Sequence, residues 1–219
     1  RGREKSRPLD DIAAEARSYV EAGVKEITLL GQNVNSYGRD LYGEPRFADV
    51  LRAVDAAGIE RLRFATSHPK DLTDEVIGLF ATLPSLMPAL HLPVQSGSNR
   101  ILSAMNRRYT REHYLGLIEK LRRARPDIAL STDIIVGFPG ETEEDFMDTY
   151  RLVEEVGYSQ VFTFIYSKRE GTPAAEMDDD TPREVIQERF DRLVDLVQRK
   201  AFEANQAELG ATVPVLVEG

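Results

Sequence analysis

Short apolar runs alternate with longer amphipathic stretches through most of the chain. The apolar runs have the length and composition of buried β-strands, and five strands are predicted, at residues 26–30, 61–65, 89–94, 131–136 and 160–166. Apolar residues at helical spacing between them predict helices at residues 8–22, 47–57, 74–82, 111–124 and 143–156, with a further short helix between residues 98 and 110. This alternation predicts an α/β fold on a parallel sheet, because each parallel crossover needs a long connection.

The segment from Ser131 to Phe146 joins a predicted buried strand to a helix through a turn without bulky residues. Gly137 and Gly140 allow the backbone to turn tightly and to approach a bound group closely. Thr142, followed three residues later by Asp145, approximates a capping box at the start of the next helix. Junctions of this kind are where α/β proteins place ligands.

A different pattern follows the fifth predicted strand. Residues 168–180 are polar and predict a linker. Residues 182–209 begin with proline and keep one apolar side, which predicts a long helix. Residues 212–217 read as a strand without a partner, so we expect a further β module to begin there.

Polar residues follow all five predicted strands at their carboxyl ends. These ends meet at one edge of a parallel sheet, so we expect a single site built from the five loops. A partial (β/α) barrel and a doubly wound open sheet both place their ligands at this edge. The pattern alone therefore leaves both architectures open.

Composition narrows the class of protein. A chain of 219 residues, 42% of them hydrophobic, is long enough for one substantial core. No apolar run approaches the roughly 18 residues of a membrane span, and the N-terminus lacks Met and a secretory signal, so we expect an internal segment of a soluble protein. The net charge of −9 argues against broad wrapping of nucleic acid by this domain alone. The lack of cysteine excludes disulfides and cysteine-ligated clusters within these residues.

Several longer motifs occur in order along the chain. They are Gly31-Gln-Asn-Val-Asn-Ser-Tyr-Gly38, Ala65-Thr-Ser-His-Pro-Lys-Asp71, His91-Leu-Pro-Val-Gln-Ser-Gly-Ser98 with Met105-Asn-Arg-Arg-Tyr-Thr110, and Phe138-Pro-Gly-Glu-Thr-Glu-Glu-Asp145 with Tyr166-Ser-Lys-Arg-Glu-Gly-Thr-Pro-Ala174. Together they resemble the radical S-adenosylmethionine methylthiotransferases over the whole chain. The Gln-Asn-Val-Asn-Ser-Tyr loop is most similar to the members that act on N(6)-isopentenyladenosine in tRNA.

The resemblance implies a parallel partial (β/α) barrel of the radical-SAM type, with five of its six strands in this chain. Residues 1–180 would form this barrel without its first strand and cluster loop, residues 181–210 a helix packing on it, and residues 211–219 the first strand of a small RNA-binding β domain. In the family, a Cys-x-x-x-Cys-x-x-Cys loop and a methylthio-donor domain precede these residues. The implied cofactors are S-adenosylmethionine and two 4Fe-4S clusters in the full-length protein, neither cluster ligated by this chain.

The resemblance also implies a reaction. In the family, an adenosyl radical removes the hydrogen on C2 of the adenine base, and a methylthio group takes its place. Because the cluster supplies the electron that starts this chemistry, we expect the isolated chain to be inactive, with neither catalytic residues nor metal ligands of its own. The implied partners are the tRNA anticodon stem-loop and an electron donor, with no membrane, in the cytoplasm.

The matching positions suggest which residues bind the cofactor and the RNA. The cofactor residues implied by the resemblance are Gly31, Gln32, Asn33, Gln95, Ser96, Ile135, Gly137, Glu4, Ser6 and Arg7. The implied substrate residues are Tyr166, Ser167 and Arg169. Structural alternatives stand beside them: a loop bonded to itself after residue 30, a helix start capped by Ser98, and an exposed charged N-terminus.

Other polar residues carry weaker signals. The superfamily's loose Gly-x-Ile-x-Gly-x-x-Glu pattern has Gly where Asp133 stands, and Glu141 lies one position late; a favourable interaction with the helix dipole is its alternative. His68 and His91 lack metal-ligand spacing and are expected to be hydrogen-bonded structural histidines. The remaining basic residues are expected to form a solvated helix face: Arg107, Arg108, Arg122, Arg123 and Arg125.

Three other functions remain open on the sequence. The nearest are methylthiotransferases that act on threonylcarbamoyl-adenosine in tRNA or on a ribosomal-protein aspartate. A non-catalytic scaffold that binds S-adenosylmethionine or RNA is an alternative of another class, favoured by the lack of cysteine. An aldolase-like or phosphate-binding barrel is disfavoured by the order of the motifs.

Overall fold

The computed structural model describes residues 5–65, 67–178, 181–213 and 215–217. Its strands are β1 (Glu26–Leu29), β2 (Arg61–Phe64), β3 (Ala89–His91), β4 (Ala129–Val136) and β5 (Gln160–Ile165). Its α-helices are α1 (Leu9–Glu21), α2 (Arg39–Tyr42), α3 (Phe47–Asp55), α4 (Asp74–Thr82), α5 (Asn99–Ala104), α6 (Arg111–Ala124), α7 (Glu143–Val156) and α8 (Arg183–Ala207). Short 3-10 turns are η1 (Val34–Ser36), η2 (Pro69–Asp71) and η3 (Pro173–Glu176).

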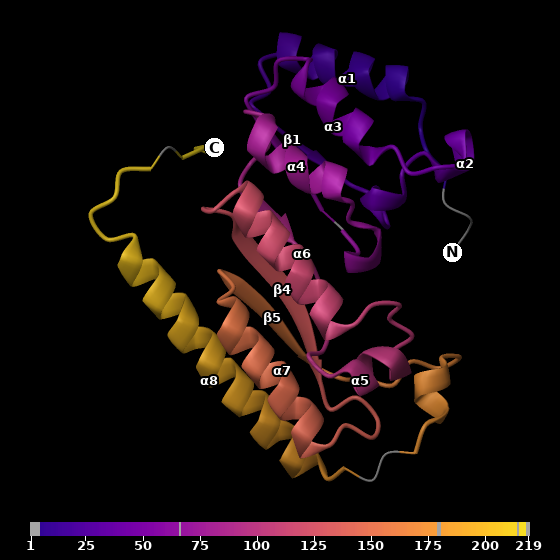
Figure 1. Ribbon diagram of the computed structural model, residues 1–219, viewed down its shortest axis with the longest axis vertical. Coiled ribbons are helices and arrows are strands. Elements are labelled where there is room, and N and C mark those ends of the chain that lie inside the picture. Colours follow the sequence, from indigo (N-terminus) through magenta and orange to yellow (C-terminus); the bar gives the residue numbers. More distant parts are fainter. Residues whose placement is uncertain (1–4, 66, 179–180, 214, 218–219) are drawn as a thin grey trace.

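The strands are parallel, as predicted. β1 pairs with β2, and β3, β4 and β5 pair in that order. Leu62 joins the two groups, because its N–H donates to Ser85 O at 2.8 Å and its carbonyl accepts from Met87 N at 3.0 Å. The strands therefore follow one another in chain order, and Figure 1 shows α6 and α7 lying over β4 and β5, with α8 beside α7.

The core lies between the sheet and these helices. In β4 every second residue is buried, so that Leu130, Ile134 and Val136 pack against the helix layer. Tyr114 of α6 and Phe146 of α7 are fully buried in the same core. The intervening strand positions face the opposite side of the sheet and remain partly exposed.

Local signals position the helices that frame the predicted site. The side chain of Thr142 accepts from Asp145 N, and the Asp145 side chain accepts from Thr142 N, which confirms the capping box at the start of α7. The side chains of Thr73, Ser98 and Thr110 cap α4, α5 and α6 by accepting a backbone N–H of the first turn, without the reciprocal bond of a capping box. The chain therefore leaves the carboxyl end of a strand and enters the following helix at a defined residue.

The third strand is shorter than the predicted range of residues 89–94. Pro93 has no N–H to donate, and the N–H of Val94 is taken by the side chain of Thr132 at 2.9 Å. Pairing resumes at Gln95, whose N–H donates to Asp133 O at 2.9 Å. The interruption comes immediately before Gln95 and Ser96, which were predicted to bind the cofactor.

The C-terminal part differs from the prediction in two places. The predicted linker contains η3, and α8 ends at Ala207 rather than Leu209. The expected strand at residues 212–217 is wrong for the residues described there, because 211–213 and 215–217 are exposed and irregular. A strand needs a partner for its backbone N–H and C=O groups, and β1 to β5 offer none nearby. Within the described part of the chain, no helix is long and apolar enough to cross a membrane.

Candidate functional site

The loop after β1 carries the first predicted cofactor residues. Gly31 and Gln32 are exposed, whereas Asn33 turns inward and donates from Nδ2 to Asp71 Oδ2 at 2.7 Å. The second oxygen of Asp71 accepts from Arg39 at 3.0 Å. Asp71 is 8% exposed, so this hydrogen-bonded ion pair fixes the amide of Asn33.

The amide oxygen of Asn33 remains available. Asn33 Oδ1 is buried and has no hydrogen-bond partner among the described residues. A buried acceptor without a partner is costly, and a ligand N–H is one group that would satisfy it. This observation fits the predicted contact with an amino group. No sequence pattern indicates that Asp71 and Arg39 hold the amide.

The segment before α1 folds back against this loop. The Ser6 hydroxyl accepts from Gly38 N at 3.0 Å, and Ser6 N donates to Asp40 Oδ2 at 2.8 Å. Arg7 forms an ion pair with Glu15 at 2.5 Å, and its carbonyl accepts from the Tyr37 hydroxyl. Ser6 and Arg7 therefore brace the loop from residue 31 to residue 38, and Glu4 lies outside the described residues.

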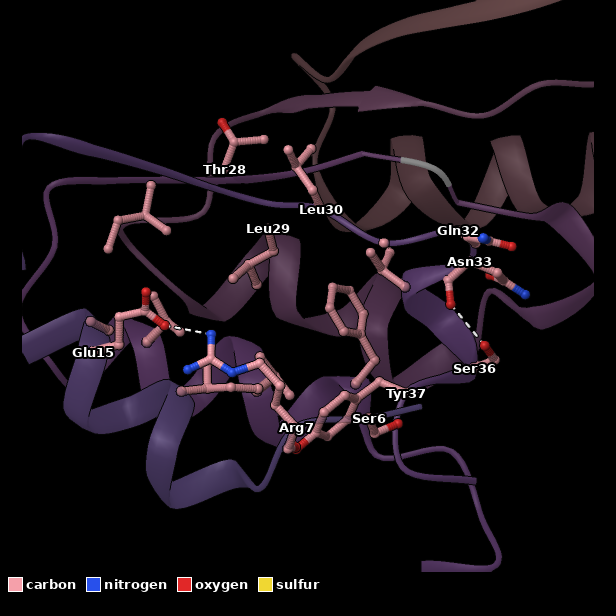
Figure 2. A pocket seen from close by; sticks show the side chains of 18 of the residues that line it. Ser6, Arg7, Glu15, Thr28, Leu29, Leu30, Gln32, Asn33, Ser36 and Tyr37 are labelled. Carbon is pink, nitrogen blue, oxygen red and sulfur yellow. Dashed lines mark hydrogen bonds and ion pairs between the residues drawn. The ribbon is translucent and has the colours of Figure 1, made fainter. Parts of the chain in front are cut away.

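A pocket of about 620 Å³ lies between α1 and β1. Figure 2 shows the Arg7–Glu15 ion pair on one side of it, and Leu29 of β1 and the following residue, Leu30, on the other. Apolar residues line much of its wall, namely Ile12, Ala16, Ile27, Leu29, Val50 and Val54. β1 pairs on one side with β2, and the pocket runs along its other side.

The loop after β3 places two predicted cofactor residues differently. Gln95 adopts a positive φ of 73°, which is a strained conformation for a residue with a side chain. Ser96 is fully buried, and its hydroxyl lies 3.2 Å from Thr149 Oγ1. Ser96 thus faces α7, which favours the structural alternative for this residue and leaves Gln95 as the side chain closer to the strand ends.

The turn after β4 is packed tightly against α8. Gly137 has a φ of +72°, and a Cβ placed there would lie 2.5 Å from Ile186 Cγ2. Its N–H donates to Glu141 Oε2 at 2.8 Å. Ile135, two residues earlier, is only partly buried and faces the side of the sheet away from the helices. Of the two predicted adenine-binding residues, Gly137 therefore lies in a tightly packed turn, and Ile135 lies in β4.

The side chain of Glu141 is bonded to the backbone of this turn at Gly137. It is 4% exposed, and burial raises its pKa to about 7, against the opposing effects of the Gly137 hydrogen bond and the Arg189 charge. Arg189 of α8 donates to the Glu141 backbone carbonyl at 2.9 Å and to Glu143 at 3.0 Å. The Glu141 carboxylate is bonded to the turn itself, and a favourable interaction with the dipole of α7 stays a prediction for this residue.

A second carboxylate joins the loops after β3 and β4. Asp145 accepts from Ser98 Oγ at 2.6 Å, and Arg100 forms an ion pair with it. Burial alone would raise the pKa of Asp145, but the hydrogen bonds from Arg100, Ser98 and Thr142 outweigh it and hold that pKa well below its usual range. Asp145 is therefore a charged anchor between the starts of α5 and α7.

The predicted RNA-contacting residues follow β5. The Tyr166 ring packs edge-on against Phe138 with centroids 5.2 Å apart, and its buried hydroxyl has no partner among the described residues. Ser167 and Arg169 are exposed. These residues lie at the same sheet edge as the turn at Gly137, since Tyr166 N donates to Val136 O at 2.8 Å.

Other sequence predictions can be compared directly with the structure. His68 accepts from Lys70 N at 3.2 Å and starts η2, as expected of a structural histidine, and burial lowers its pKa. Arg123 and Arg125 pair locally with Glu119 and Asp127 on an exposed helix end. Arg122 instead donates to the carbonyl of Val156. The described residues contain no group of carboxylates and histidines able to hold a metal ion.

Comparison with known families identifies this arrangement. The profile of the Radical SAM superfamily matches residues 1–153, more than half of the chain. The chain belongs to this superfamily. Members use S-adenosylmethionine with a 4Fe-4S cluster, and the unsatisfied Asn33 oxygen fits S-adenosylmethionine. No residue present fits the role of cysteine ligand to the cluster.

The chain is also similar to curated proteins over its full length. It is 55% identical to the tRNA-2-methylthio-N(6)-dimethylallyladenosine synthase of Acetivibrio thermocellus, covering 100% of this chain and 46% of the relative. The proteins of the same name from Alkaliphilus oremlandii and Carboxydothermus hydrogenoformans are 56% and 54% identical, again over 100% of this chain. The chain spans about half the length of these relatives, covering 47% and 50% of the latter two.

Solved structures confirm the fold class. Coproporphyrinogen III oxidase from Escherichia coli, a radical SAM enzyme, superposes with a TM-score of 0.61 over 88% of this chain and 46% of its own, at 15% identity. Methylornithine synthase superposes with a TM-score of 0.58 over 92% of this chain and 55% of its own, at 13% identity. The parallel strands thus form a partial barrel of the radical-SAM type, and the open-sheet alternative is set aside.

Proposed function

We propose that the full-length protein containing this chain transfers a methylthio group to C2 of N(6)-isopentenyladenosine beside the anticodon of tRNA. The observation that carries the proposal is the identity of 54–56% over this whole chain to synthases named for that product. The same identity disfavours the threonylcarbamoyl-adenosine and ribosomal-protein alternatives. Because the chain spans about half of those relatives, the complete reaction needs residues beyond it.

The residues of this chain bind and orient the cofactor. Asn33 offers its free amide oxygen to the cofactor's amino group, and Gln32 and Gly31 lie beside it. Gln95 approaches from the loop after β3, and the backbone of Ile135 and Gly137 receives the adenine. Bound beside a reduced cluster, S-adenosylmethionine supplies the radical that attacks an unreactive C–H bond. Cysteines outside this chain ligate that cluster and the second cluster of the donor domain.

The pocket beside β1 is where we place the remaining strand of the barrel. Its apolar wall and the free side of β1 suit one further parallel strand, which we assign to the segment that precedes residue 1 in the full-length protein. We propose that residues 1–180 form the barrel, that 181–210 form the helix packed on it, and that 211–219, irregular where they are described, lead into an RNA-binding β domain.

The RNA would approach the carboxyl ends of the strands. Tyr166, Ser167 and Arg169 are placed to contact the anticodon stem-loop, because aromatic stacking and phosphate contacts are the usual means of holding unpaired RNA. The net charge of −9 means that most of the electrostatic attraction for RNA comes from outside this chain. A tRNA substrate also implies a cytoplasmic location and a reducing partner there.

Anaerobic turnover with defined substrates tests the proposal. The full-length protein, reconstituted with iron and sulfide, is incubated with S-adenosylmethionine, a reductant and stem-loops that carry either isopentenyladenosine or threonylcarbamoyl-adenosine. Mass spectrometry of the digested RNA should show a methylthio product from the first stem-loop only. A product from the second only would assign the sister activity, and no product from a protein with intact clusters would contradict methylthiolation.

A further inference from the structure

The face of the sheet opposite the helices carries a polar and aromatic patch. Alternate residues of β4 point to this face, among them Ser131 and Asp133. The register places His91 of β3 beside Ser131, and Phe162 of β5 beside Asp133. Four side chains from three neighbouring strands therefore share one surface below the predicted cofactor loops.

The polar members of this patch are linked to one another. His91 Nδ1 lies 3.0 Å from Ser131 Oγ, and His91 Nε2 lies 3.5 Å from Asp133 Oδ1. The side chains of His91 and Asp133 are 29% and 28% exposed, so both can still reach a ligand. His91 and Ser131 also line a pocket of about 410 Å³ beside this patch, together with Thr28, Arg63 and Gln160; Asp133 and Phe162 lie outside its lining. The predicted structural role of His91 accounts for its bonds but not for its exposure.

The aromatic members are more exposed than apolar side chains in a strand usually are. Phe162 is 42% exposed and Phe164 is 51% exposed, and both alternate with residues that face the helices. The His91 ring packs edge-on against Phe162 at a centroid distance of 5.9 Å. Exposed aromatic surface beside partly buried hydrogen-bonding groups is typical of a binding site for a flat, partly apolar ligand.

The product named for the relatives has matching chemistry. An adenine with a dimethylallyl group on N(6) keeps one N–H on that nitrogen and acceptors on its ring, next to an apolar branched chain. Asp133 can accept the N–H, His91 can donate to a ring nitrogen, and Phe162 offers a surface for the ring. Phe164 lies on the same face of β5 as Phe162 and two residues nearer the carboxyl end of the strand. There it can cover the apolar dimethylallyl group.

We propose that His91, Asp133 and Phe162 hold the adenine base of the substrate inside the partial barrel, and that Phe164 recognises its N(6) dimethylallyl group. The inference rests on the proposed function and adds the residues that select the modified base. It also assigns a role to the departure at Asp133, which stands where the superfamily pattern has glycine. In this proposal a side chain is needed at position 133 because the Asp133 carboxylate holds the base.

Binding of two matched RNAs separates base recognition from recognition of the apolar group. The reconstituted full-length protein, saturated with S-adenosylmethionine without reductant, is titrated with anticodon stem-loops carrying isopentenyladenosine or plain adenosine. The wild type should prefer the isopentenyl stem-loop by about tenfold or more, as expected for burying a five-carbon group. Phe164→Ala should reduce this preference to within about threefold while binding of the plain stem-loop stays unchanged. Phe162→Ala and Asp133→Ala should weaken binding of both.

Ile165→Ala is the matched control, because Ile165 is 41% exposed on the same strand but faces the other side. It should bind both stem-loops as the wild type does. All variants should still cleave S-adenosylmethionine to 5′-deoxyadenosine without RNA at the wild-type rate, which shows that fold and cofactor site are intact.

Three results would overturn the inference: an unchanged preference in Phe164→Ala, a wild type that does not discriminate the two stem-loops, or loss of cofactor cleavage in Asp133→Ala with the control unaffected. A wild type that methylthiolates isopentenyladenosine while the variants keep their selectivity refutes this inference alone. A wild type that makes no methylthio product refutes the proposed function instead.

Discussion

Arg189 of α8 donates a hydrogen bond to the backbone carbonyl of Glu141, 2.9 Å away, and so joins the C-terminal helix to the turn after β4. Both residues are buried, Arg189 at 6% and Glu141 at 4% exposure. Their charged groups lie 3.9 Å apart. The turn that is proposed to receive the cofactor's adenine is thus held in place by a helix more than 40 residues further along the chain.

Removal of the Arg189 side chain should destabilise the fold. Arg189→Ala leaves the buried Glu141 without its cationic partner, which is expected to cost about 3 kcal/mol of unfolding free energy. Arg199→Ala on the same helix is the control, since Arg199 is 55% exposed and 4.0 Å from Glu154; it should cost less than about 0.5 kcal/mol. Urea unfolding of the two variants measures both values, and equal losses would contradict the role given to Arg189.

The unfolding free energy should depend on pH through the titration of Glu141. Its pKa of about 7 in the folded chain lies above its ordinary value of 4.5, so the folded state holds this proton more tightly than the unfolded state. The resulting stabilisation is present below about pH 4.5 and lost as the pH rises through about 7. Compared with Glu141→Gln, which does not titrate, the wild type should lose about 3 kcal/mol between pH 4.5 and 8. The account would be contradicted if the wild type kept its stability relative to Glu141→Gln, or gained stability relative to it, as the pH rises from 4.5 to 8.

Gly137 should tolerate no larger residue. Gly137→Ala combines a positive φ with a Cβ 2.5 Å from Ile186 Cγ2, whereas Gly140→Ala has a similar φ of +75° and open space around the Cβ. Both variants should lose about 1 kcal/mol from backbone strain, and Gly137→Ala a further 1–3 kcal/mol from overlap. Adding Ile186→Ala should relieve only the overlap. Thermal melts of the four proteins test this, and equal melting points for the two glycine variants would refute the contact.

Asp71 should strengthen the binding of S-adenosylmethionine without contacting it directly. It fixes the Asn33 amide through a 2.7 Å hydrogen bond, so Asp71→Ala should weaken S-adenosylmethionine binding by the full-length protein about tenfold. Asp74→Ala, which removes an exposed carboxylate paired with Lys120, should leave the affinity unchanged. Equilibrium dialysis supplies both dissociation constants. Normal affinity in Asp71→Ala would show that the Asn33 amide is not a cofactor contact.

The open side of β1 should make the isolated chain self-associate. Leu30, directly after this strand, is 77% exposed, and unpaired strand edges are templates for pairing with another chain. Sedimentation velocity should show concentration-dependent association that Leu30→Lys reduces. A wild-type chain that remains monomeric up to about 100 μM would contradict this expectation.

Local signals in the sequence predicted most of the fold. The capping box at Thr142 and Asp145 defined the start of α7, and the proline at position 182 preceded α8 as expected. The end of β3 was missed because the pairing fails through two separate causes, a proline and the side chain of Thr132 on the neighbouring strand. Only the second requires knowledge of which strands are adjacent.

The site was predictable as an edge of the sheet and less so in its details. The motif after β1 includes Asn33, but Asp71, which holds its amide, follows β2, and Arg39, which pairs with Asp71, lies in α2. The sequence pattern defines only the position of Glu141, and its bond to Gly137 follows from a backbone turn that no spacing rule describes. Long-range contacts of this kind depend on tertiary packing, which alternation and capping patterns do not encode.

Nucleoside analysis of cellular tRNA tests the central claim most directly. The gene for the full-length protein is deleted in its own organism, and the tRNA nucleosides are quantified by mass spectrometry with and without restoration of the gene. The proposal predicts that 2-methylthio-N(6)-isopentenyladenosine disappears, that N(6)-isopentenyladenosine accumulates in its place, and that the restored gene reverses both changes. An unchanged level of the methylthio nucleoside in the deletion strain would contradict it.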